Sequence, residues 1–112
     1  MKPPKETAEL LQAWETFAQS LAAGYTCDLD DWRNDVDARR LLAEGPPLSS
    51  EQAQRLAAAD KLVRAAVRPH DRCVWGRKNA QKHGWNADEH WYYFMVPNAL
   101  GETFAADLTK LR

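Results

Sequence analysis

One stretch of the sequence, RPHDRCVWGRKNAQKHGWNADEHWYYF (residues 68–94), concentrates the side chains that could do chemistry. It holds all three histidines, one of the two cysteines and six of the eleven Trp, Tyr and Phe residues. Histidine and cysteine bind zinc, a cysteine beside a histidine can act as a nucleophile, and cations among aromatic rings are typical of binding surfaces. The segment therefore poses a choice between a metal site, a catalytic site and a binding surface.

Spacing argues against a metal site and missing motifs argue against an enzyme. His70 and Cys73 are separated by two residues and His83 and His90 by six, whereas the second pair of a zinc finger is usually separated by roughly three to five. The sequence contains no CxxC, GxSxG, HExxH, P-loop or Rossmann motif. We therefore expect no metal, no other cofactor and no enzymatic activity, and we interpret Cys27 and Cys73 as thiols packed inside the protein.

The net charge of −1 conceals an uneven distribution along the chain. Residues 1–60 carry six Lys and Arg against eleven Asp and Glu, whereas residues 61–112 carry nine against five. From Lys61 to Lys82 there are seven basic residues and one acid. Opposite charges within one small domain can pair across the fold, or they can leave a positive patch on its surface. We expect pairing between the halves, with the positive patch as the alternative.

Length and composition place the chain among small globular proteins. Its 112 residues, 45% hydrophobic and 28% charged, suit one domain with its own core, residues 1–112. The longest apolar run, WYYFMV, has six residues where a membrane span needs roughly twenty. The N-terminal MKPPKETAEL lacks the apolar stretch of a signal peptide. We therefore expect a cytoplasmic protein that does not bind membranes.

Four helices are predicted from apolar residues at three- and four-residue spacing and from signals at helix ends. They cover residues 5–23, 29–44, 50–67 and 102–110. Ser49 and Gln52 have the spacing of a capping box, and Pro69 ends the third helix. The residues expected in the core are Trp14, Phe17, Leu21, Trp32, Val36, Leu56 and Val63.

Beyond Pro69 the sequence favours extended structure. RCVW (residues 72–75) and HWYYFMV (residues 90–96) are rich in β-prone residues and are predicted to be strands. The GRKNAQKHG between them suits about two helical turns, with Gly84 as the stop. A helical start to the HWYYF segment is a competing interpretation. The predicted fold class is α+β, mainly α, with about four helices and a small two-stranded antiparallel element.

An extended HWYYFMV segment would place aromatic or apolar side chains on both of its faces. Either helices cover both faces and form a core, or part of the segment is left as an exposed patch. Trp, Tyr and Arg are frequent anchors of protein interfaces. We expect a small protein-binding module, comparable with bacterial immunity proteins, antitoxins or adaptors, that uses an aromatic and basic surface in residues 68–96. The expected partner-binding residues are Trp75, Arg77, Lys78, Lys82, Trp85, Trp91 and Tyr93.

Binding to nucleic acid is the alternative hypothesis for the same region. The Arg, Lys and Trp residues of 61–91 could neutralise phosphates and stack on bases. Against this hypothesis stand the acidic first half, a pI near 6.3 and the absence of a helix-turn-helix, RNA-recognition or zinc-finger signature.

Overall fold

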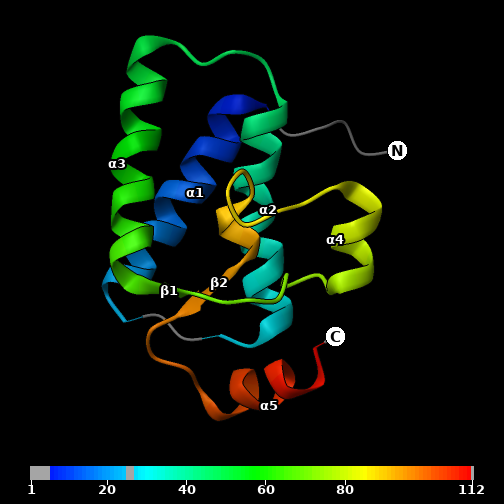
Figure 1. Cartoon of the computed structure of the whole chain (residues 1–112). Coiled ribbons are helices and arrows are strands. Elements are labelled where there is room, and N and C mark those ends of the chain that lie inside the picture. The colour runs from blue at the N-terminus through cyan, green and yellow to red at the C-terminus, as the bar shows by residue number, and fades with distance from the viewer. Residues whose placement is uncertain (1–5, 25–26, 112) are drawn as a thin grey trace.

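Three long helices form the body of the protein. The computed structural model describes residues 6–24 and 27–111. The long helices are α1 (Thr7–Ala22), α2 (Leu29–Glu44) and α3 (Ser50–Ala66). Helix α1 lies between the other two and packs against both (Figure 1). These helices confirm the sequence prediction, except that Lys5, the predicted first residue, lies outside the described residues.

The helix ends follow from side chains that complete the backbone hydrogen bonding. Asp28 begins α2 by accepting a 2.8 Å hydrogen bond from the backbone N–H of Asp31. At the start of α3, the Ser49 hydroxyl accepts from the Gln52 N–H at 3.1 Å, and the Gln52 side chain accepts from the Ser49 N–H at 3.1 Å. The predicted capping box is therefore confirmed. None of the described helices has the length and apolarity to span a membrane.

Two three-residue strands, β1 (Val67–Pro69) and β2 (Met95–Pro97), form an antiparallel pair in which Arg68 lies opposite Val96. The predicted strands at 72–75 and 90–96 are therefore wrong in position. Residues 72–75 form a bend and a turn, and Trp91–Tyr93 is a single 3₁₀ turn, η1, as the competing helical interpretation had it. The reason is local: α3 ends at Ala66, the chain is extended only from Val67 to Pro69, and the bend and turn that follow leave little chain for a longer ladder.

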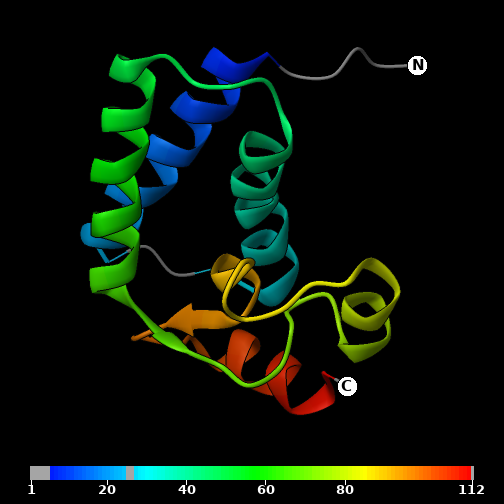
Figure 2. The same ribbon diagram turned by 45° about the horizontal axis from the view of Figure 1, so that its top comes forward.

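A short helix follows each strand. Helix α4 (Arg77–His83) comes after β1, and α5 (Glu102–Lys110) comes after β2. The described part of the chain thus has five α-helices and two strands, which confirms the mainly α fold class with one helix more than expected. The additional helix, α4, ends at Gly84, whose φ of 72° lies in the left-handed region that glycine adopts without strain. Helix α5 covers the end of the body at which α2 begins (Figure 2).

Aliphatic and aromatic side chains together build the core, and the largest of them are aromatic rings. Trp32 lies at its centre, with the ring centroid of Phe17 at 5.2 Å and that of Phe104 at 5.7 Å, both edge to face. Tyr92 and Tyr93 are also buried. Both are in η1, so part of the segment 68–94, which holds the histidines and Cys73, belongs to the core. Of the seven predicted core residues, six are buried, and Leu56 is half-buried against the others.

Candidate functional site

Three hydrogen bonds tie the aromatic segment, residues 68–94, to the middle of α2. Asp37 accepts two hydrogen bonds at Oδ1, one from Trp75 Nε1 at 3.0 Å and one from the Tyr93 hydroxyl at 2.5 Å. Arg40 Nε donates to the same hydroxyl at 2.7 Å. Burial raises the pKa of Tyr93 well above its ordinary value, and the hydrogen bond that it donates to Asp37 raises it further. We call Asp37, Arg40, Trp75 and Tyr93 the Asp37 hub.

The hub positions helix α4 beside α2, on the side away from α1 and α3 (Figures 1 and 2). Trp75 precedes the helix, and Ala80 is its buried residue. Trp85 follows it and packs on Tyr93 with ring centroids 4.7 Å apart. The outer side chains of α4 are exposed, and we call Arg77, Lys78 and Lys82 the basic arm.

The ion pairs of the described residues do not join the two halves of the chain. Arg39 pairs with Asp60 at 3.0 Å, Arg40 with Glu44 at 2.9 Å, and the remaining Arg-to-carboxylate pairs are Arg33–Asp30 and Arg55–Glu15. All eight residues precede position 61. The expectation of pairing between the halves is therefore wrong, because the polar flanks of α1, α2 and α3 pair with one another. The seven cations from Lys61 to Lys82 have no carboxylate within 4.0 Å in the described structure.

A small hollow lies where the 85–95 segment meets the end of α3 and β1. It has a volume of about 270 Å³ and is mostly apolar. Its lining, which we call the Trp91 hollow, consists of Arg64, Val67, Pro69, His70, Ala87, Trp91, Phe94 and Met95. Trp91 and Phe94 are half-buried, so part of each ring faces the solvent in the hollow. The aromatic segment is thus part core and part surface.

The seven predicted partner-binding residues fall into three groups. Tyr93, Trp75 and Trp85 lie at or beside the Asp37 hub, and Tyr93 has an exposed fraction of 0%. The three cations form the basic arm, and Trp91 lies apart from them in the hollow. Phe94 also lines the hollow but was not among the predicted residues. Its place in a predicted strand did not distinguish it from its buried neighbours.

Cys73 and the histidines have separate surroundings. Cys73 is 1% exposed, and burial raises the pKa of its thiol, which is the opposite of what activates a nucleophilic cysteine. His83 stacks on Trp85 with ring centroids 4.6 Å apart, and His70 accepts the backbone N–H of Arg72 at 3.1 Å. Within residues 6–24 and 27–111, His, Cys, Asp and Glu form no group of three that could hold a metal ion.

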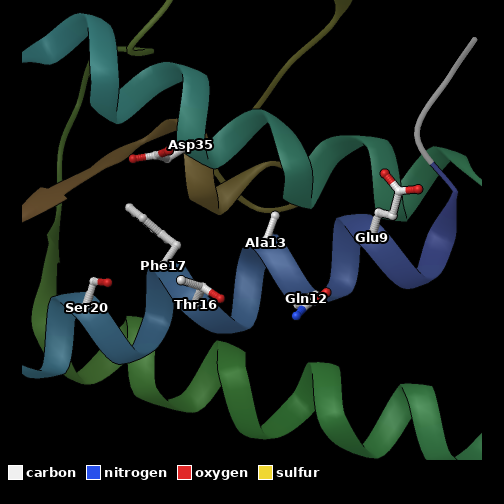
Figure 3. Close-up of a pocket in the computed structure, with 7 residues that line it drawn as sticks. All are labelled: Glu9, Gln12, Ala13, Thr16, Phe17, Ser20 and Asp35. Carbon is white, nitrogen blue, oxygen red and sulfur yellow. The ribbon is translucent and has the colours of Figure 1, made fainter.

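A second concavity, of about 550 Å³, runs between α1 and α2. Figure 3 shows Ala13 and Phe17 pointing from α1 toward α2, with Asp35 on the facing helix and Glu9 at the other end. Two carboxylates and no cation line this groove. Burial raises the pKa of Asp35, and the negative charge of Asp31 adds to that effect.

Asp35 gives a prediction for pH dependence. A carboxyl with a raised pKa binds its proton more tightly in the folded state, so folding is favoured at low pH and this contribution is lost as pH rises through the folded pKa. Asp35→Asn should therefore have a higher Tm than the wild type at about pH 7, and the difference should vanish near pH 3. Thermal unfolding followed by circular dichroism checks this. A lower Tm for Asp35→Asn at neutral pH would contradict it.

Comparison with known proteins gives no match. The chain fits no protein-family model, and no curated protein or solved structure is significantly similar to it. Its function is therefore inferred from the arrangement of its own residues.

Proposed function

We propose that the chain is a small protein-binding module, and that its partner contacts the basic arm and the Trp91 hollow. The observation that carries this proposal is that the described ion pairs between arginine and carboxylate all precede position 61, which leaves the later cations unpaired. The cations from Lys61 to Lys82 have no carboxylate partner in the described structure, and one of them, Arg64, lines the hollow in which the half-buried Trp91 and Phe94 face the solvent. A basic arm and an aromatic hollow with a cation in its lining are complementary to an acidic partner surface with an apolar protrusion.

The Asp37 hub supports this proposal because it holds the basic arm in one place. A seven-residue helix is too short to be stable alone, so α4 depends on contacts with the body. Trp75 before the helix and Trp85 after it supply these contacts, through Asp37 and Tyr93 respectively. Side chains that are positioned before binding lose less entropy when a partner arrives.

Nucleic acid is the second candidate, and the tryptophan rings argue against it. The guanidinium of Arg33 lies 4.7 Å from the ring centre of Trp75, and that of Arg64 lies 3.9 Å from the ring centre of Trp91. His83 stacks on Trp85. A base that stacks on one of these occupied faces must displace the cation or the imidazole, which weakens the stacking that single-stranded nucleic acids require.

Capture from an extract of the native cell, followed by measurement with the purified ligand, tests the proposal. We expect the wild type to retain a protein, and the triple variant Arg77→Glu, Lys78→Glu, Lys82→Glu to lose it. Lys110→Glu, on α5 outside the proposed surface, should keep it. With the purified partner, Phe94→Ala should weaken binding by at least about 30-fold, as for a central interface residue. Leu41→Ala, an exposed apolar residue on α2, is the matched control.

Salt dependence separates the two candidates. A protein partner should show a modest change in Kd between about 50 and about 200 mM salt. A nucleic acid should lose on the order of a thousandfold or more in affinity over the same range, and each removed cation should reduce the salt slope by about one unit. Steep salt dependence, with no effect from Phe94→Ala, would overturn the protein-binding proposal in favour of nucleic acid.

A further inference from the structure

Arg64 is the cation whose position in the Trp91 hollow is best defined. Its guanidinium carbon lies 3.9 Å from the centre of the Trp91 ring, so the aromatic face holds the head group in place. In the described structure, its N–H groups donate no hydrogen bond and no carboxylate pairs with it. A guanidinium presents its donors in a fixed fork that matches a carboxylate. Arg64 is therefore oriented by Trp91 and has its donors available.

The hollow beside Arg64 fits a single apolar group. Its volume of about 270 Å³ lies just below the range of roughly 300–1,000 Å³ that holds drug-sized ligands. Val67 and Pro69 contribute aliphatic carbons from β1, and Trp91 and Phe94 contribute ring surface from the opposite segment. Burying one aromatic or branched aliphatic side chain there removes apolar surface from water on both partners.

His70 adds a second polar group to the lining. Its Nδ1 lies 3.1 Å from the backbone nitrogen and 3.2 Å from the carbonyl oxygen of Arg72, which fixes the position of the ring in the lining. The Asp71 carboxylate lies 3.8 Å from His70 Nδ1, but its side chain is 90% exposed and is not part of the lining. Of the residues that line the hollow, Arg64 carries the one permanent positive charge, which suits an anionic ligand.

We propose that the Trp91 hollow binds the C-terminal residue of a partner chain, with its apolar side chain in the hollow and its α-carboxylate on Arg64. A C-terminal residue carries both groups on one Cα, which suits a cavity for one side chain with a cation at its edge. An internal acidic residue would place its carboxylate and the apolar side chain on different residues. This inference rests on the proposed protein-binding function and names the part of the partner that the hollow recognises.

The test uses the full chain labelled with ¹⁵N and three short peptides followed by NMR. The peptides are acetyl-Ala-Ala-Phe with a free C-terminus, the same peptide as its C-terminal amide, and acetyl-Ala-Ala-Ala with a free C-terminus. We expect the free Phe peptide to shift the Trp91 Nε1–H and Ala87 amide signals, with a Kd at least about tenfold lower than that of either other peptide, since each lacks one of the two recognised groups.

Arg64→Gln should remove the preference for the free acid over the amide, whereas Arg68→Gln should keep it. Arg68 is the matched control because it is an exposed cation on β1 that does not line the hollow. Equal affinity for acid and amide in the wild type, or shifts confined to residues outside the hollow, would overturn the inference. So would tighter binding of an internal Phe-Asp peptide with both ends blocked.

Failure of this inference is distinguishable from failure of the proposed function. If the peptides do not bind in the hollow but a captured protein is still lost from the basic-arm triple variant, the C-terminal inference is wrong and the protein-binding function stands. If neither the peptides nor a protein binds, both are wrong.

Discussion

Trp14→Ala should lower the free energy of unfolding by about 4 kcal/mol, the upper range for large-to-small changes in a core. Trp14 is fully buried in α1, the helix that packs against both α2 and α3. Its ring centroid lies 5.3 Å from that of Phe17 and 6.3 Å from that of Trp91. Removing the indole therefore opens a cavity at the point where the body meets the aromatic segment. Urea unfolding followed by circular dichroism measures the change.

Trp14→Phe separates the packing of the ring from its hydrogen bond. The indole Nε1 donates to Asp60 Oδ1 at 2.9 Å, and Arg39 donates to both oxygens of the same carboxylate at 3.0 Å. Because Asp60 keeps Arg39 as its partner, Trp14→Phe should cost less than Trp14→Ala, about 1–2 kcal/mol. Leu41→Ala, at an exposed position, should cost under about 0.5 kcal/mol. A loss below about 1 kcal/mol in Trp14→Ala would place the ring at the surface.

The helical body could be predicted because its signals are local. The stripe of Leu10, Trp14, Phe17 and Leu21 repeats at helical spacing, and all four residues are buried on one side of α1. Asp28 and Ser49 lie within a few residues of the N–H groups that they cap. Such interactions are decided by neighbours in the sequence, and the sequence therefore predicts them.

The aromatic segment could not be predicted in the same way, because local turns override its β propensity. The side chain of Asn86 accepts the backbone N–H groups of Asp88 and Glu89 at 3.1 and 2.9 Å, which turns the chain before Trp91. Tertiary packing then selects which rings are buried. Tyr92 and Tyr93 enter the core, whereas Trp91 and Phe94 stay half-exposed, a division that no period-two pattern predicts.

The candidate site depends on contacts between residues far apart in the sequence. Asp37 meets Trp75 and Tyr93 across 38 and 56 positions. The sequence predicted that residues 68–96 hold the binding surface, but the partition between a partly buried hub, an exposed basic arm and a separate hollow exists only in three dimensions. The same holds for the charges, because the positions of α1, α2 and α3 decide which carboxylates reach which arginines.

Removing the acceptor of the Asp37 hub should have the second large effect on the free energy of unfolding. Asp37→Ala should lower the free energy of unfolding by about 2–3 kcal/mol, because it leaves the Trp75 N–H and the buried Tyr93 hydroxyl without their acceptor. Asp30→Ala is the matched control. Asp30 is on the same helix and pairs with Arg33, but its side chain is 72% exposed, so its removal should cost under about 0.5 kcal/mol.

Hydrogen exchange should show that Asp37→Ala acts first on α4. The backbone N–H of Trp85 donates to the carbonyl of Ala80 at 2.9 Å, and that of Ala80 donates to the carbonyl of Gly76 at 3.1 Å. The Ala80 amide is in α4 and the Trp85 amide closes the C-terminal end of that helix, whose two flanking tryptophans contact the hub. In Asp37→Ala both amides should exchange faster by a larger factor than the amides in the middle of α1, because a local opening of α4 adds to global unfolding. Equal acceleration in α1 and α4 would mean that the hub stabilises the whole fold rather than positioning the basic arm.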